Sequence, residues 1–160
     1  MYLRYLGIFA IFVSCSAVGF LLAGSEGGRL KNNEALIALI KHIRRKALYF
    51  KSPSADIFES FSSDPLEKNG FCSIMRAEGL SAALDRVKCF ELYEPCERSV
   101  EHFAHEMGAL PIGELVSSCD NLIEELCENQ ARLSKESPAR QKAYSSLGML
   151  FGIMIVILLV

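Results

Sequence analysis

The chain has 160 residues, enough for one domain of ordinary size, and 51% of them are hydrophobic, at the upper edge of globular usage. The formal net charge of −2 argues against a nucleic-acid-binding role, because neutralising phosphates requires a basic surface. All of the 17 Lys and Arg residues except Arg4 lie between Arg29 and Lys142. The middle of the chain therefore has the charge of an ordinary protein, whereas the two ends are apolar.

The N-terminal stretch 5–24 carries no charge. A helix of about 20 apolar residues crosses the roughly 30 Å of hydrocarbon in a bilayer, so this stretch predicts a transmembrane helix. Two alternatives stay open. The small residues Ala23 to Ser25 resemble a signal-peptide cleavage site, and Cys15 stands where a lipoprotein would be lipidated. The apolar sequence that continues after Cys15 favours an anchor that is kept.

The C-terminal stretch 143–160 also carries no charge and predicts a second transmembrane helix. Residues 145–160 would rise only about 24 Å as a helix, so the span must include Ala143 and Tyr144 or the bilayer must thin locally. A buried helix that ends the domain is the alternative. Residues 152–160 are apolar on every side, however, which favours a membrane span.

Basic residues flank both apolar stretches on the side of the middle region. Arg29 and Lys31 follow the first stretch, and Arg132, Lys135, Arg140 and Lys142 precede the second. Segments rich in Lys and Arg near the ends of a span stay on the cytoplasmic side. We therefore predict a hairpin topology, with a cytoplasmic domain at 29–142 and both termini across the membrane.

The middle region has a helical period. Apolar residues recur at three- and four-residue steps from Leu30 to Phe50 and predict an amphipathic helix. Its buried stripe is predicted to contain Leu36, Leu39, Ile40, Ile43, Ala47 and Phe50. Gly24, Gly27 and Gly28 precede this helix and predict a flexible exit from the membrane.

Further helices follow along the chain. Ser52 and Pro53 provide an N-cap and a first-turn proline for a short helix. That helix is predicted to bury Ile57, Phe58 and Phe61. The stretch 62–70 is rich in turn residues and predicts a loop. A third helix is expected over 73–91, ending ahead of Pro95.

The last part of the middle region predicts a helix from Cys96 to Met107, stopped at Gly108, and a fifth helix that begins at Pro111. The apolar stripe of the fifth helix is predicted to contain Ile112, Leu115, Val116, Cys119, Leu122, Ile123, Leu126 and Leu133. Pro138 predicts a kink or a break. No stretch alternates as a strand does, so the predicted fold is all-α, a helical bundle between two transmembrane helices.

The chain offers no convincing catalytic, cofactor or metal site. The nearest candidate is Cys96 with His102, His105 and Glu106, but their spacing is not that of the His-Glu-x-x-His zinc motif. Cysteines in a cytoplasmic domain are expected to be reduced. The acidic face of the fifth helix is either a partner surface or an ordinary solvated face. It carries Glu114, Asp120, Glu124, Glu125 and Glu128.

Several short blocks resemble the stage III sporulation protein AB family of endospore-forming bacteria. The C-terminal block carries the most specific part of the likeness: Lys142, Tyr144, Ser146, Leu147 and Gly148, followed by Gly152 and an aliphatic finish. The helix 29–50 with its following Ser-Pro also matches. The block Phe103-x-x-x-Met107-Gly108 resembles a Phe-Gly-x-x-Leu-Gly segment of the family, and the likeness covers nearly the whole chain.

This chain departs from the family pattern at four places. Ala104 stands where the family usually has glycine, and Pro111 and Leu115 stand near positions where it tends to have Asp and Gln. Pro138 falls where the family's helix usually continues. The departures near Gly108 bear on any partner contact made through the turn at 108–114.

The resemblance implies a non-enzymatic subunit in the mother-cell half of the channel between mother cell and forespore. Members are similar to the cytoplasmic domains of the type II secretion inner-membrane platform protein. The likeness thus implies contact with a secretion-type ATPase, stage III sporulation protein AA, and with neighbouring membrane subunits on the mother-cell side of the outer forespore membrane. The residues expected at such contacts are Arg44, Arg45, Lys46, Glu114, Glu124, Glu125 and Glu128.

Three other functions stay open at this point. A cleaved or lipidated extracytoplasmic helical protein would follow from the alternatives for the first stretch. A metal-dependent enzyme would use His102 and His105. A generic membrane adaptor outside sporulation would share the topology without the family's role.

Overall fold

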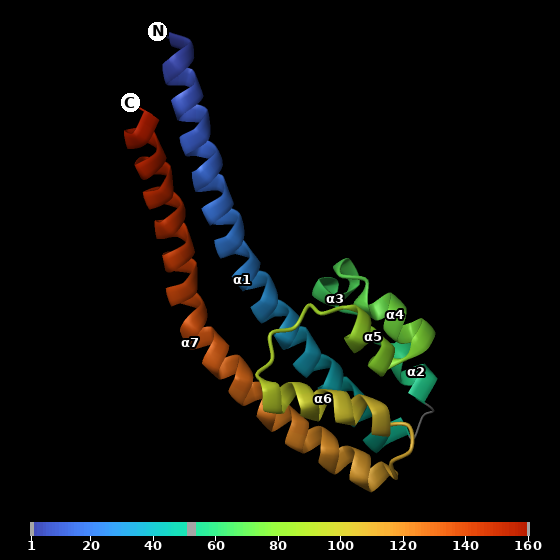
Figure 1. The fold of residues 1–160 in the computed structure, drawn as a ribbon. Coiled ribbons are helices and arrows are strands. Elements are labelled where there is room, and N and C mark those ends of the chain that lie inside the picture. The colour runs from blue at the N-terminus through green and yellow to red at the C-terminus, as the bar shows by residue number, and fades with distance from the viewer. Residues whose placement is uncertain (1, 51–53, 160) are drawn as a thin grey trace. The chain divides into compact units, whose positions relative to one another are not determined.

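The computed structural model describes the backbone of residues 2–50 and 54–159, and side chains chiefly over 27–49 and 57–151. Within these residues every regular element is a helix, which confirms the all-α prediction (Figure 1). The helices are α1 (Tyr2–Phe50), α2 (Ser54–Glu59), α3 (Asp64–Lys68), α4 (Phe71–Glu78), α5 (Leu80–Arg86), α6 (Glu94–Glu106) and α7 (Ile112–Leu159).

The chain forms two compact units. The central unit is 29–132, and the flanking unit combines 1–28 with 133–160. Each of the long helices α1 and α7 has one part in the flanking unit and another part in the central unit. The short helices α2 to α6 belong to the central unit alone.

The core of the central unit is apolar and continuous. Leu36, Leu39, Ile40 and Ile43 are fully buried, and Ala47 is nearly so, which confirms the predicted stripe of α1 over its described side chains. The facing residues include Ile57, Phe58 and Phe61 as predicted, together with Leu66, Phe71, Met75, Val100, Phe103, Cys119, Leu122 and Leu126. Burying one such large side chain contributes roughly 1.5–3 kcal/mol. Ser52 and Pro53, predicted to open the short helix, lie outside the described residues.

The stretch 62–70 is not the predicted loop, because it contains α3. Pro65 lies in the first turn, where a missing N–H costs nothing, and the amide of Glu67 donates to the carbonyl of Ser63 at 2.9 Å. Leu66 is fully buried and anchors the helix in the core. The turn residues had suggested a loop, but a single apolar anchor and a proline-led first turn favour a short helix.

The single helix predicted over 73–91 is also wrong. Gly79 has φ of 97° and ψ of 173°, a backbone conformation that is essentially reserved for glycine, and it divides the stretch into α4 and α5. After Arg86 the chain is not helical again until Glu94. Residues 87–93, which we call the strap, connect α5 to α6 without helical structure.

The long helices differ from expectation at their boundaries. α1 is continuous through Gly24, Gly27 and Gly28, so the predicted flexible exit is wrong. Each glycine weakens a helix by about 1 kcal/mol relative to alanine, which does not end a helix with strong formers on both sides. A kink or a break was predicted at Pro138; α7 continues through this residue, so the break is wrong. Ser137, directly before this proline, is buried.

The stripe predicted on α7 is only partly correct. Leu115, Cys119, Leu122, Leu126 and Leu133 are buried. Val116 and Ile123 are partly buried, and Ile112 is 44% exposed because it lies in the first turn of the helix. Helix α6 begins two residues earlier than predicted and ends one residue earlier, at Glu106.

In the flanking unit, the first part of α1 and the last part of α7 run side by side (Figure 1). Polar contacts lie near the start of its α7 part. Arg140 pairs with Glu136 at 2.8 Å, and the Gln141 amide donates to the Ser137 hydroxyl at 3.4 Å. Most side chains of the predicted span 5–24, and Val160 at the end of the second, lie outside the described residues. Over the described residues, no helix combines the length and apolarity needed to cross a membrane.

Replacing Phe71 with alanine should destabilise the central unit by about 3–5 kcal/mol, because Phe71 is fully buried and its removal leaves a cavity. Thermal unfolding of the full chain in detergent, followed by circular dichroism, measures the change. Tyr49→Ala is the control, since Tyr49 is 76% exposed and its loss should change stability by less than about 0.5 kcal/mol. Equal melting temperatures for the two variants would contradict the assigned core.

Candidate functional site

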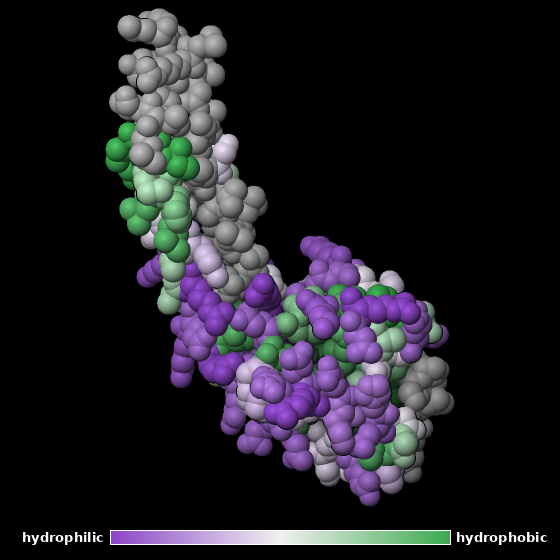
Figure 2. Space-filling model, in the orientation of Figure 1, coloured by the Kyte–Doolittle hydropathy of each residue, from purple (hydrophilic) through white to green (hydrophobic). Residues whose placement is uncertain are grey.

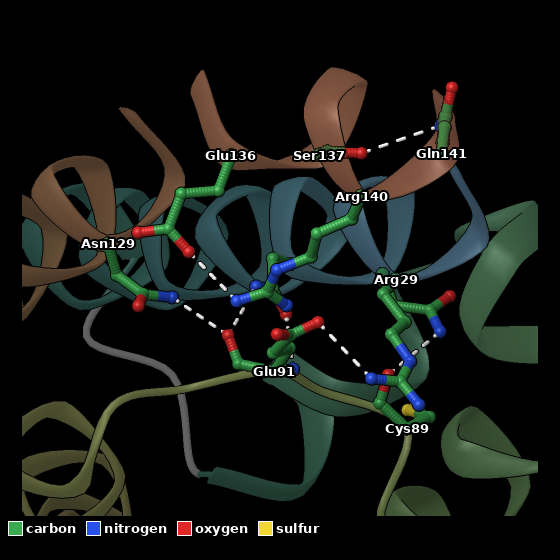
Figure 3. Close-up of polar contacts among 10 residues, drawn as sticks. Arg29, Cys89, Glu91, Asn129, Glu136, Ser137, Arg140 and Gln141 are labelled. Atoms are coloured by element: carbon green, nitrogen blue, oxygen red, sulfur yellow. Dashed lines mark hydrogen bonds and ion pairs between the residues drawn. The ribbon is translucent and has the colours of Figure 1, made fainter. Parts of the chain in front are cut away.

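Two buried asparagines bind the backbone amide and carbonyl of Glu91. The Asn33 side chain on α1 donates from Nδ2 to the Glu91 carbonyl at 2.8 Å and accepts the Glu91 amide at Oδ1 at 3.1 Å. Asn129 on α7 donates to the same carbonyl at 2.9 Å (Figure 3). Asn33 and Asn129 are each only 1% exposed. We call these three residues the asparagine clasp.

Further contacts hold the strap beside the clasp. The Asn32 amide donates to the Cys89 carbonyl at 3.0 Å, and the Arg29 guanidinium pairs with the Glu91 carboxylate at 3.3 Å (Figure 3). The guanidinium of Arg132 lies 4.9 Å from the centre of the Tyr93 ring, a cation–π geometry. Strap residues from 89 to 93 are thus bound by side chains from both long helices.

The clasp explains why the strap is not helical. A buried backbone N–H or C=O without a partner costs about 1–3 kcal/mol. Glu91 satisfies both groups through Asn33 rather than through a helical turn. Sequence reasoning missed this role, although a signal was present. Asn33 lies three residues before Leu36, and Asn129 three after Leu126, so both amides interrupt an apolar stripe at a core position.

The basic residues predicted as a partner surface have different surroundings. Arg44 forms a two-pronged ion pair with Asp120, one contact being Nη2 to Oδ2 at 3.2 Å. This pair links α1 to α7, so Arg44 is engaged within the central unit. Arg45 is exposed and lies 3.5 Å from His42 Nδ1, and Lys46 is half-buried. Burial lowers the pKa of His42, and the nearby charges of Arg45 and Lys46 act in the same direction.

The acidic residues of α7 are also not equivalent. Glu114, Glu124 and Glu128 are exposed, whereas Glu125 is half-buried and its Oε2 is enclosed without a hydrogen-bond donor. Glu114 and Glu125 line two adjoining hollows between α6 and α7. These hollows share His102, Ser118 and Asn121. The predicted acidic face is therefore exposed only in part.

The residues considered for metal binding do not converge. His102 contacts Glu106 at 3.2 Å, whereas His105 lies 3.2 Å from the hydroxyl of Ser81 on α5. Cys96 is fully buried. Across the part of the chain that the structure describes, no group of three or more His, Cys, Asp or Glu residues is arranged to hold a metal ion.

The buried thiols have environments that disfavour the thiolate. Burial, with the Glu125 charge as a smaller contribution, raises the pKa of Cys96 to about 11. Burial raises the pKa of Cys119 to about 12, Asp120 adding to the shift and Arg44 opposing it. Cys127, by contrast, is exposed. Because the thiolate is the reactive form, Cys96 and Cys119 are inert in the folded chain.

A family model described as stage III sporulation protein AB matches residues 4–160. The chain belongs to this family. The resemblance carried by the C-terminal block is thereby confirmed, and membership gives the chain a role in sporulation. The family is one of sporulation proteins and not a known enzyme family. A search of curated proteins and a search of solved structures each gave no match.

Replacing Asn33 with leucine keeps its approximate size but removes both bonds to Glu91. The Glu91 amide then loses this hydrogen bond in a partly buried position, so the unfolding free energy should fall by about 1–3 kcal/mol. Melting of the full chain in detergent tests this. Asn121→Leu makes the same chemical change at an exposed position of α7 and should be nearly neutral. If the two variants have the same melting temperature, the clasp does not stabilise the fold.

Proposed function

We propose that the chain is a non-enzymatic membrane platform subunit of the channel that joins mother cell and forespore. In this role the central unit docks a secretion-type ATPase, stage III sporulation protein AA, at the mother-cell side of the outer forespore membrane. The observation that carries the proposal is the family match over residues 4–160, because it spans both the apolar ends and the helical middle.

Exposed apolar side chains support membrane association of the flanking unit. Between residues 144 and 157 the exposed large hydrophobic residues are Tyr144, Leu147, Met149, Leu150, Phe151, Ile153, Met154 and Ile157 (Figure 2). Water disfavours an apolar surface of this extent, and lipid or a partner would cover it. We propose 143–160 as one membrane helix on this basis, and 5–24 as the other because that stretch carries no charge.

The connections of the central unit support a hairpin topology. The Gln130 side chain donates to the Leu30 carbonyl at 3.2 Å, so the chain enters and leaves the central unit at neighbouring points. Arg29, Lys31 and Arg132 lie at these points, where basic residues favour the cytoplasmic side. The cytoplasmic domain is accordingly proposed to comprise 29–142.

The ATPase-binding residues are proposed to be the charged side chains that the fold leaves exposed. Arg45, Glu114, Glu124 and Glu128 meet this condition. Arg44, Lys46 and Glu125 are less accessible, and Arg44 contributes mainly by fixing α1 against α7 through Asp120.

Charge reversal at Arg45 tests the docking proposal. Arg45→Glu should reduce co-purification of the ATPase with the full chain from sporulating cells by tenfold or more, because a like charge in a complementary interface costs several kcal/mol. Lys68→Glu, at an exposed position of α3, is the matched control and should leave the yield unchanged. Normal recovery of the ATPase with Arg45→Glu would show that Arg45 is not part of the interface. Absence of the ATPase from the wild-type preparation would refute docking itself.

Cys127 tests the topology, because it is the exposed thiol of the central unit whereas Cys72 and Cys96 are buried. In a Cys15→Ser background, a membrane-impermeant maleimide should leave Cys127 unlabelled in intact cells and label it after permeabilisation. Cys96 and Cys119 should react only after unfolding, which provides an internal check that the chain is folded. Labelling of Cys127 in intact cells would place the central unit outside and support the extracytoplasmic alternative.

A further inference from the structure

A cavity of about 330 Å³ opens between α5, the strap and α6. Its volume is at the small end of the range for ligand pockets. The apolar part of its lining consists of Leu84, Val87, Phe90, Leu92 and Val100. Such a lining favours an apolar side chain over water.

The structure holds the wall of this cavity in place before anything binds. The strap supplies Val87, Phe90 and Leu92, and the asparagine clasp fixes its backbone at Glu91. The Phe90 ring packs edge-on against Phe71, with centroids 5.2 Å apart. A site that is already ordered loses less entropy when a ligand binds.

The mouth of the cavity is acidic. Asp85, Glu97 and Glu101 are exposed on its lining, and none of them forms an ion pair with a described residue. Glu97 and Glu101 lie one helical turn apart on α6, where two like charges repel each other. Lys88 is the basic residue of the lining.

Carboxylates on the neighbouring short helices α4 and α3 are paired. Glu78 binds Arg86 with contacts of 2.6 and 2.7 Å, and Glu67 binds Arg76 at 3.3 Å. Glu78 and Glu67 are thus each paired with an arginine, whereas the carboxylates at the cavity mouth have no such ion pair with a described residue. Three negative charges around an apolar interior are complementary to a cationic and partly apolar ligand.

We propose that this cavity docks a segment of a partner protein in which an apolar side chain is flanked by lysine or arginine. The apolar side chain enters the cavity, and the flanking cations pair with Asp85, Glu97 and Glu101. This site is distinct from Arg45 and from the acidic face of α7, and it does not depend on the docking of an ATPase.

The first experiment uses three fluorescein-labelled peptides and the full chain in a neutral detergent, with protein-free micelles as the blank. The probe Lys-Leu-Lys-Lys-Leu-Lys should bind, as measured by fluorescence anisotropy. A peptide with serine in place of leucine keeps the charge and should bind at least fivefold more weakly. A peptide with glutamate in place of lysine keeps the apolar residues and should also bind at least fivefold more weakly.

Protein variants then locate the site. Glu97→Gln/Glu101→Gln should weaken binding of the leucine–lysine peptide about five- to tenfold, since two exposed charge pairs are lost. Glu34→Gln/Glu59→Gln removes the same charge from exposed positions outside the cavity and should have no effect. All four positions are exposed, so helicity by circular dichroism should match the wild type.

Three results would overturn the proposal. Absence of binding of the leucine–lysine peptide at millimolar concentration would show that the cavity does not accept this class of ligand. Equal affinity for the serine peptide would show that binding depends on charge alone and that no apolar side chain enters the cavity. Equal weakening by the two double variants would mean that the peptide senses the overall charge and not the cavity.

Discussion

The backbone of Glu91 is bound by one asparagine side chain from each of the two long helices of the central unit. Asn33 satisfies the amide and the carbonyl together, and Asn129 adds a second donor to the carbonyl. Because both asparagine side chains are buried, loss of Asn33 removes the bond to the Glu91 amide, whereas the carbonyl keeps Asn129 as a donor. The strap is therefore held at this point by side chains from both long helices. In this position it forms one wall of the acidic cavity.

Much of the helical framework follows from the sequence because its signals are local. The stripes of α1 and α7 repeat every three or four residues, and the proline and glycine around α6 mark its ends within two residues. The errors occur where a local rule competes with tertiary packing. Leu66 turns a polar loop into α3, and the conformation of Gly79 breaks an otherwise helical pattern. At Pro138 the local rule predicts an interruption, but α7 is continuous there. A long helix tolerates the loss of one hydrogen bond.

The candidate sites were less predictable than the helices. A single sequence shows that Arg44 and Asp120 are charged, but only the packing of α1 on α7 pairs them. The acidic cavity combines side chains from α5, the strap and α6, and residues 87–91 of the strap had been predicted as helix. The clasp was in principle detectable, because an asparagine within an apolar stripe requires a buried partner. Family membership, by contrast, was recognisable from the order of short blocks and is supported across residues 4–160.

The clasp holds the strap in place, and native-state hydrogen exchange at the Glu91 amide tests this most directly. In the full chain this amide should exchange as slowly as the amides of the core helices, although it lies outside every helix. The protection should disappear in Asn33→Leu while the core of α1 stays protected. An amide at Glu91 that exchanges in the wild type as fast as exposed loop amides would contradict the account, since the strap would then not be held by the buried asparagines.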